Sequence, residues 1–405
     1  MNVNCEVING LYNLLDAETK SFTDRSVDKI VEVKKKGGKV VVATGSGPNI
    51  HEGVTTLIAE LMKKGIIDGV TTSSAVIAHE MGGVLDKVKR VDAEKLKGYI
   101  DLSKTPRGNI FEFTEMTEEQ LDTLSKEMIL DENLLKRGAE IEGSVIIKAA
   151  GNMAYPMGLR TEMLAYEIGA IARTYGMPFE SVAGLGADER TMIGTGARKG
   201  IPVLVSVPQL VGGGAVGMCI ADSIPNTQRC ARIAQMLQDA DVIIESAVVL
   251  TQEIHDGPFE TYTGHGIWHH RMGYNTYSLK DKTIIRIDLD ENLKKAWELD
   301  KKSGTIQSAI DKGLPKTKLS KIPFRMEMSA FSRLENSIPI VGDIGVIWPI
   351  MALKVSRALG IDLDFISYPQ QSPEGQAMRE YIVKEIKPLD KTLMLSKIQS
   401  KKFTY

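Results

Sequence analysis

The sequence predicts an α/β protein with a mostly parallel sheet, helices on both faces of that sheet and extra outer helices. Short apolar runs alternate with helical segments along most of the 405 residues, as in proteins built from βαβ units. Small polar turns follow several of these runs. Glycine is frequent, at 37 residues, and aromatic residues make up 6%, which fits many βα turns better than an all-β sandwich.

The composition excludes several classes of protein. Hydrophobic residues are 43% and charged residues 25%, which is ordinary for a globular chain, and the net charge of −2 argues against a nucleic-acid scaffold. Cys5, Cys219 and Cys230 form neither a disulfide framework nor a zinc-binding pair. The first ten residues lack the pattern of a signal peptide, and no apolar run reaches the roughly 18 residues of a membrane span. We therefore expect a cytoplasmic protein with no nucleic-acid or membrane partner.

We expect three parts along the chain: a helical arm at 1–38, an α/β core at 39–360 and a tail at 361–405. The charged region at about 84–143 reads as a helical insertion in the core, with a capping box from Thr117 to Gln120. The strands that we expect after the first one lie at 70–74, 144–149, 201–207, 241–249, 283–288 and 338–341.

The first predicted strand leads into the most informative turn of the chain, within residues 39–53 (KVVVATGSGPNIHEG). Its continuous apolar run is typical of a strand buried on both faces, and the turn Gly45-Ser46-Gly47 precedes a helix expected near His51. Such a turn offers backbone N–H groups to an anion. The dinucleotide fingerprint is incomplete, because Ile50 stands at its third glycine. An ordinary tight βα turn is the alternative.

A second segment, residues 251–271, concentrates polar side chains after the predicted strand at 241–249. His265 and Asp256 can form an acid–base pair, because imidazole titrates near neutrality. A metal site from His265, His269 and a carboxylate is a second reading, and a hydrogen-bonded structural loop is a third. The polar and aromatic residues of the segment are Glu253, His255, Asp256, Glu260, His265, Trp268, His269 and His270.

Three other polar segments are candidates for a functional site, each with a structural alternative. His79 and Glu80 follow the predicted strand at 70–74, where they either face a ligand or form a solvated helix cap. The run 188–190 (DER) is more consistent with a structural surface turn. Lys148 can form an imine only if it is buried, and an ordinary lysine at a strand end is the preferred interpretation.

Five segments together resemble the deoxyhypusine synthase family of NAD-binding proteins. They are ATGSGPNIHEGV, GVTTSSAVIAHE, GIPVLVSVPQLVGGGAVG, ADVIIESAVVLTQEIHDG and GDIGVIWPIMAL, and they keep the family's order over residues 39–353. The first part of the chain is also similar to archaeal NAD-dependent ornithine cyclodeaminase. The resemblance implies a Rossmann-like sheet of the deoxyhypusine synthase type, NAD as cofactor and a homo-oligomer, by resemblance a tetramer.

The resemblance also implies which residues form the site. The residues implied to contact the cofactor are Gly45, Ser46, Gly47, Asn49, Thr72, Ser73, Ser74 and Asp343. His79 and Glu80 would face the substrate. The family's Trp-Gly-Lys motif, which carries an imine-forming lysine, is absent before Asp343, and Val211-Gly212 replaces its Thr-Asp-Gly aspartate. Deoxyhypusine synthesis itself is therefore not expected.

These observations favour an NAD-dependent enzyme that abstracts hydride from an amine or amino acid, followed by transfer, deamination or cyclisation. The catalytic candidates are His265, Asp256 and Glu253, and the substrate-binding candidates are His79, Glu80, Trp268 and His269. No metal is assigned to this reading. A metal-dependent hydrolase or lyase that uses the 255–271 histidines is one alternative. A non-catalytic nucleotide-sensing protein is the other.

Overall fold

The computed structural model describes most of the chain. The described residues are 3–45, 47–105, 108–151, 154–206, 213–246, 277, 279, 281–289, 291–314, 320–322 and 336–400. The chain folds into two compact units, one of residues 1–49, 60–72 and 226–369, and the other of residues 50–59, 73–225 and 370–405. The predicted division at residues 38 and 360 stays a prediction.

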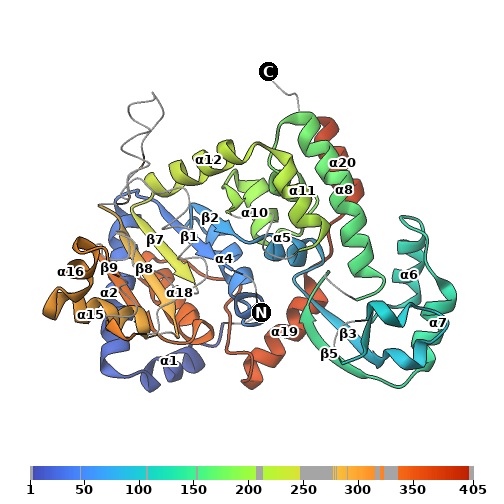
Figure 1. Ribbon diagram of the computed structural model, residues 1–405, viewed down its shortest axis with the longest axis horizontal. Helices are drawn as coiled ribbons and strands as arrows, with labels where there is room; N and C mark the ends of the chain where they lie inside the picture. The colour runs from blue at the N-terminus through green and yellow to red at the C-terminus, as the bar shows by residue number, and fades with distance from the viewer. Residues whose placement is uncertain are drawn as a thin grey trace. The chain divides into compact units, whose positions relative to one another are not determined.

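The first unit contains a parallel sheet. Five of its strands lie side by side in the order β2-β1-β7-β8-β9, and each neighbouring pair is parallel (Figure 1). The predicted α/β fold with a mostly parallel main sheet is thereby confirmed. The strands are β1 (Val40–Thr44), β2 (Gly69–Thr72), β7 (Val242–Ser246), β8 (Thr283–Asp288) and β9 (Ser337–Val341).

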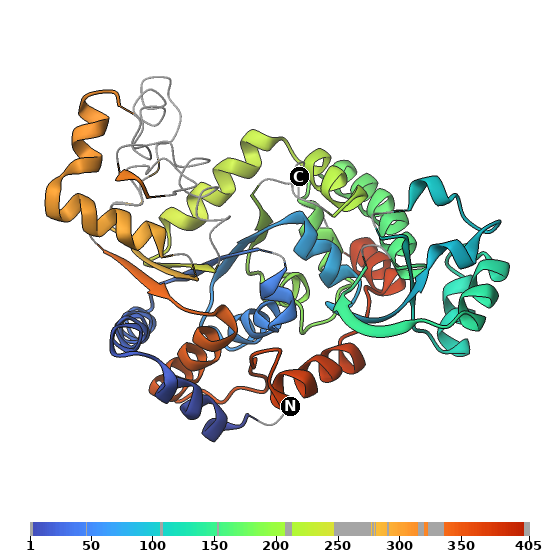
Figure 2. The same cartoon turned by 60° about the horizontal axis from the view of Figure 1, so that its bottom comes forward.

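Helices cover both faces of this sheet, as expected (Figure 2). On one face, Ile30 of α2 and Trp348 of α18 pack with Val40 and Ile244 of the strands. On the other face, α12 comes so close that a Cβ on Gly69 would lie 2.7 Å from the Met236 sulfur. The helices of this unit are α1 (Cys5–Leu14), α2 (Ala17–Lys35), α12 (Asn226–Gln238), α15 (Asn292–Ser303), α16 (Thr305–Asp311) and α18 (Ile344–Leu359).

Strand β1 is a central strand because its side chains are apolar or small. All five of its residues are buried, and it is hydrogen-bonded to β2 on one side and β7 on the other. Each fully buried aliphatic side chain of this kind contributes about 1.5–3 kcal/mol to folding. Two helices follow β1, α3 (Pro48–His51) and α4 (Val54–Lys63), and each includes residues of both units.

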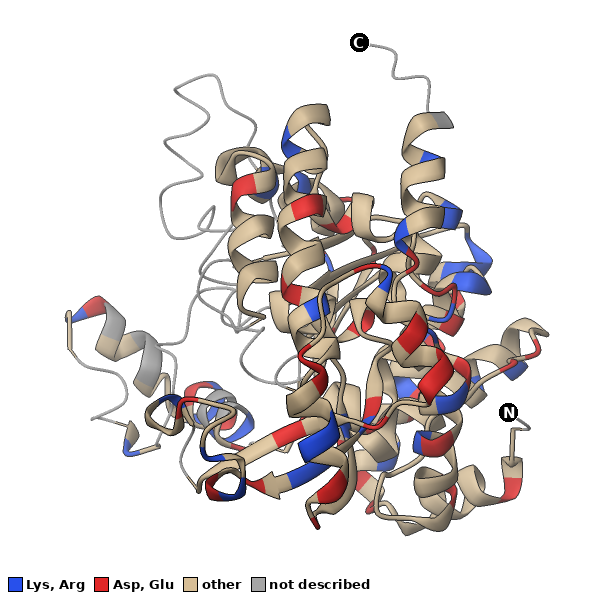
Figure 3. Cartoon of the chain, turned by 90° about the vertical axis from the view of Figure 1, so that its right-hand side faces the viewer, with Lys and Arg blue, Asp and Glu red and all other residues tan. Residues whose placement is uncertain are grey.

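The second unit contains a smaller antiparallel sheet in the order β4-β3-β5. Residues 144–149, expected as a strand of the parallel sheet, form β5 (Ser144–Ala149) at the edge of this sheet. The region 84–143, expected to be helical, contains β3 (Leu85–Asp92) and β4 (Ile110–Thr114) as well as two helices. Acidic and basic residues are interspersed on this sheet (Figure 3).

The spacing of apolar residues explains this error. Leu85, Val88 and Val91 recur every third residue, which is a helical interval, yet all three are buried in a strand that is paired on both sides.

The capping box from Thr117 to Gln120 is confirmed at the start of α6. The remaining elements of this unit include α5 (Ser74–Met81), η1 (Ala93–Leu96), η2 (Leu102–Lys104), α6 (Glu118–Ser125), α7 (Glu132–Glu140), α8 (Met157–Tyr175), α9 (Phe179–Ala183), α10 (Met192–Lys199), β6 (Val203–Val205), α11 (Ala215–Ser223), α19 (Pro373–Glu385) and α20 (Lys391–Ser400). Within the described ranges, none of the helices has the length and apolar character that crossing a membrane requires.

Candidate functional site

The carboxyl ends of β1, β2 and β7 lie next to one another, which is where parallel sheets bind ligands. Thr44 is the register partner of Ser246, and Ala43 is the partner of Thr71. The hydroxyls of Thr44, Thr71 and Thr72 are buried and have no hydrogen-bond partner among the residues that the structure describes. Because buried polar groups are rarely left unpaired, three such hydroxyls at one sheet edge are consistent with a polar ligand there.

The glycine turn after β1 has the backbone freedom that the sequence predicts. Gly47 has φ +63°, and a Cβ at this position would meet no atom within 4 Å. Only glycine adopts this conformation without strain. The turn leads directly into the short helix α3 at Pro48, and the helix that the sequence predicted from near His51 is α4, which begins at Val54.

Asn49, a predicted cofactor contact, has its side chain inside the protein. Its Oδ1 accepts a hydrogen bond from Ser246 Oγ at 2.6 Å, and its Nδ2 donates to the Ser246 carbonyl at 3.3 Å. Trp348 Nε1 donates to the same Ser246 Oγ at 2.9 Å. This Asn49–Ser246–Trp348 triad joins α3, which follows the glycine turn, to the end of β7 and to α18. Sequence reasoning missed Ser246 and Trp348, although a serine that ends a buried apolar strand was a usable signal.

Asp343 follows β9 and caps α18. Its Oδ1 accepts the N–H of Gly345 at 2.8 Å, which stabilises the helix start through a hydrogen bond and through the helix dipole. Its other carboxylate oxygen has no hydrogen-bond partner within the described ranges. Asp343 therefore keeps one acceptor for a ligand at the edge formed by the strand ends.

Buried charges also lie near this edge and were not singled out from the sequence. Glu245 of β7 is the register partner of Arg286 of β8, so the two side chains share one face of the sheet. The Arg286 Nη2 atom lies 3.0 Å from Asp288 Oδ2. Glu245 is 1% exposed and Arg286 is 5% exposed. Buried carboxylates and guanidinium groups are seldom found in proteins without a partner of opposite charge.

The residues after β2 continue into the second unit. Ser73 occupies the N-cap position of α5, yet its side chain makes no capping hydrogen bond. The Ser73 hydroxyl is buried and unpartnered in the described structure, like those of the threonines before it. Ser74 is the first residue of α5 and is fully buried.

Glu80 anchors α10 within the second unit. Its side chain is fully buried, and it accepts the N–H groups of Met192 at 2.8 Å and Ile193 at 3.0 Å. Burial raises the pKa of Glu80 to about 7, and these two hydrogen bonds oppose the increase. The first turn of α10 thus uses both carboxylate oxygens, and the predicted contact of Glu80 with substrate stays a prediction.

His79 is fixed by the end of β5. Its Nδ1 lies 2.6 Å from the carbonyl oxygen of Ala150, so Nδ1 carries the proton and Nε2 of the neutral ring is an acceptor. Burial lowers the pKa of His79, the hydrogen bond to Ala150 opposes this shift, and repulsion by His51 and Lys148 adds to it. The lowered pKa favours the neutral ring of His79, whose Nε2 can accept a hydrogen bond.

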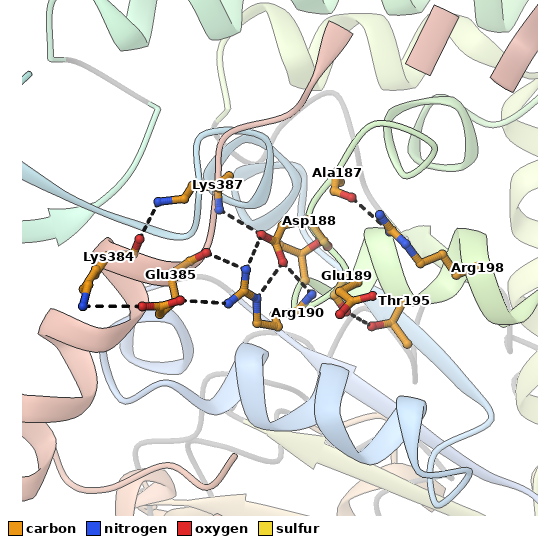
Figure 4. Close-up of polar contacts among 10 residues, drawn as sticks. Ala187, Asp188, Glu189, Arg190, Thr195, Arg198, Lys384, Glu385 and Lys387 are labelled. Atoms are coloured by element: carbon orange, nitrogen blue, oxygen red, sulfur yellow. Dashed lines mark hydrogen bonds and ion pairs between the residues drawn. The ribbon is translucent and has the colours of Figure 1, made fainter. Parts of the chain in front are cut away.

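The turn at 188–190 is structural, as the sequence favoured (Figure 4). Arg190 makes two hydrogen bonds of 2.9 Å to the carboxylate of Asp188 and donates to the Glu385 carbonyl. The N–H of Lys387 donates to Asp188 Oδ2 at 3.0 Å. These contacts attach the chain after α19 to the turn before α10.

Six of the predicted site residues lie outside the described residues: Ser46, Glu253, Asp256, His265, Trp268 and His269. Their roles stay predictions. Among the described residues, no group of three or more histidine, cysteine, aspartate or glutamate side chains could hold a metal ion.

Solved structures are similar to this chain at low sequence identity. AgrE in complex with ornithine and NAD+ has 13% identity and a TM-score of 0.40 over 85% of this chain. ArgZ, an arginine dihydrolase of the cyanobacterial ornithine–ammonia cycle, has 10% identity and a TM-score of 0.41 over 85% of it. The chain covers 34% of each of these two proteins.

A proposed deoxyhypusine synthase from Entamoeba histolytica has 11% identity and a TM-score of 0.40, over 87% of this chain and 93% of that protein. The family named from the sequence is thus among these structures. No family model and no curated protein matches the chain. The functional argument therefore comes from this chain's own residues.

Proposed function

We propose that this protein is an NAD-dependent enzyme that abstracts hydride from an amine or amino-acid substrate and then completes a transfer, deamination or cyclisation. The observation that carries the proposal is the set of buried hydroxyls of Thr44, Thr71 and Thr72 beside the Gly47 turn, none of which has a partner among the described residues. These groups fit a polar cofactor laid along the strand ends.

Each residue of this edge has a distinct role in the proposal. NAD, when bound, supplies the hydride acceptor. Gly45, Ser46 and Gly47 would hold it through the backbone, and Thr72, Ser73 and Ser74 through hydroxyl and backbone groups. The free oxygen of Asp343 would accept a hydrogen bond from a ribose hydroxyl. The Asn49–Ser246–Trp348 triad keeps the glycine turn in place.

The remaining candidates would act on the substrate. His79 accepts a hydrogen bond or proton through Nε2, since the carbonyl of Ala150 occupies Nδ1. Asp256 and His265 would exchange the protons of the reaction, and Glu253 would hold a cationic group. Trp268 and His269 would complete the substrate contacts. The missing lysine motif excludes deoxyhypusine synthesis from the proposal.

A pair of matched threonine variants tests the cofactor site. Thr72 ends β2 and Thr114 ends β4, and the hydroxyl of each is buried and unpartnered among described residues. Replacement by valine keeps the shape, so neither Thr72→Val nor Thr114→Val should destabilise the protein. Only Thr72→Val should weaken NAD binding, by about tenfold for one lost hydrogen bond.

Calorimetry and NAD-dependent thermal shifts on wild type and both variants provide the measurement. Wild-type protein that neither contains nor binds NAD would overturn the proposal. Equal losses of NAD affinity in the two variants would remove Thr72 from the site.

A further inference from the structure

Basic side chains from three elements of the second unit meet at the end of β5. The carbonyl of Ile147 accepts a hydrogen bond from Arg379 Nη2 of α19 at 2.6 Å. Lys148 is the next residue, and the carbonyl of Ala150 holds His79 of α5 at 2.6 Å. Strand β5 lies at the edge of its sheet, so these carbonyls are accessible to side chains from outside the sheet.

His51 is the fourth member of this basic cluster, which we define as His51, His79, Lys148 and Arg379. Burial lowers the pKa of His51, and the charges of Arg379 and Lys148 lower it further. His51 in turn acts on His79 in the same way. His51 is thus near Arg379, Lys148 and His79, and repulsion disfavours the charged form of both histidines. An anion bound among these groups would favour the charged forms of the histidines and so raise their pKa values.

Four acidic residues lie around the basic cluster, and one of them, Glu112, already pairs with Lys148 of the cluster. Glu112 binds Lys148 at 2.6 Å and Arg90 at 3.2 Å. Glu52 accepts the N–H of Gln370 at 2.7 Å. Glu380 pairs with Lys87 at 2.6 Å, and burial raises the pKa of Asp86, the register partner of Lys148, to about 7.

Arg379 differs from the other cations of this region. Within the described part of the chain it has no carboxylate at ion-pair distance, and its Nε–H is buried without an acceptor. Burial lowers the pKa of Arg379, while the charges of Glu52 and Glu380 raise it. A half-buried guanidinium with a free donor is well suited to bind the two oxygens of a carboxylate.

We propose that Arg379, with Lys148 and His51 beside it, binds the carboxylate of an α-amino-acid substrate, and that His79 Nε2 accepts a hydrogen bond from the substrate's amino group. This proposal rests on the proposed function and narrows its substrate class from amines or amino acids to amino acids alone. A phosphate group of the cofactor could use the same donors, and the experiment below separates these two sources.

The test compares amino acids with their decarboxylated counterparts. Thermal shifts are measured with and without NAD for L-ornithine, L-arginine and L-lysine, and for putrescine, agmatine and cadaverine. We expect at least one amino acid to stabilise the protein, with its amine at least tenfold weaker. Arg379→Met should abolish the amino-acid response and leave the NAD response unchanged. Arg379→Lys should restore part of the amino-acid response. Lys384→Met, which changes an exposed residue of the same helix, should affect neither response.

The outcomes distinguish this proposal from the proposed function. An amino-acid response without any response to NAD would refute the proposed function and support the carboxylate site. Equal responses to amino acids and amines, or no response to any amino acid, would overturn the carboxylate site. Loss of the NAD response in Arg379→Met, with a normal urea-unfolding midpoint, would assign the basic cluster to phosphate instead.

Discussion

Replacing Ser246 by alanine tests the buried triad that supports the proposed cofactor edge. Ser246 Oγ donates to Asn49 Oδ1 and accepts from Trp348 Nε1, at 2.6 and 2.9 Å. Ser246 and Asn49 are fully buried and Trp348 is 1% exposed. Alanine removes the hydroxyl and leaves one buried acceptor and one buried donor without partners.

The magnitude follows from these two orphaned groups. Each buried polar group that loses its only partner costs roughly 1–3 kcal/mol. Asn49 retains its second hydrogen bond, from Nδ2 to the Ser246 carbonyl, so the damage is confined to Oδ1 and the indole N–H. We therefore expect Ser246→Ala to lower the free energy of unfolding by about 3 kcal/mol.

Urea unfolding followed by circular dichroism provides the assay, with Ser356→Ala as the matched control. Ser356 is 2% exposed, but its hydroxyl only donates to the Leu353 carbonyl within α18. Its loss should cost no more than about 1 kcal/mol. If the two variants unfold within about 0.5 kcal/mol of each other, the triad does not stabilise the edge and the reasoning fails.

Three further changes have defined outcomes. Gly47→Ala places a Cβ in open space at φ +63°, so urea unfolding should show a loss of about 1 kcal/mol from backbone strain alone. Asp86 has its pKa raised by burial from an ordinary 3.8 to about 7, so the folded state binds the proton more tightly than the unfolded state between these values. Stability should fall as pH rises from 4 to 7, and Asp86→Asn should reduce this slope and be the more stable protein at pH 8. Glu80→Gln should instead destabilise at pH 8 by about 2 kcal/mol, because one amide oxygen cannot serve the N–H groups of both Met192 and Ile193; a neutral result in urea unfolding would contradict the anchoring role.

Local pattern was sufficient to predict much of the parallel sheet. The run at 40–43 contains no polar side chain that could face solvent, so it predicts a strand that is covered on both faces. The capping box at Thr117 and the glycine turn at Gly47 depend on residues within a few positions, and both are confirmed. The pattern gave the wrong prediction at 85–92. Charged residues separate the buried Leu85, Val88 and Val91 of β3, so these apolar residues recur at a helical interval although they lie in a strand.

The candidate site depends on contacts that sequence spacing does not encode. Ser246 lies 197 positions from Asn49, His79 lies 71 from Ala150, and Arg379 lies 232 from Ile147. Each of these polar side chains looks ordinary in its own segment, and its role comes from the partner that folding brings to it. The sequence by itself determined the strands of the parallel sheet, the glycine turn and the small polar residues at the strand ends, because hydrophobic period and backbone freedom are local properties. Only the tertiary structure decided which buried polar groups find partners and which keep a free donor or acceptor for a ligand, because hydrogen bonding inside a protein is set by neighbours distant in the chain.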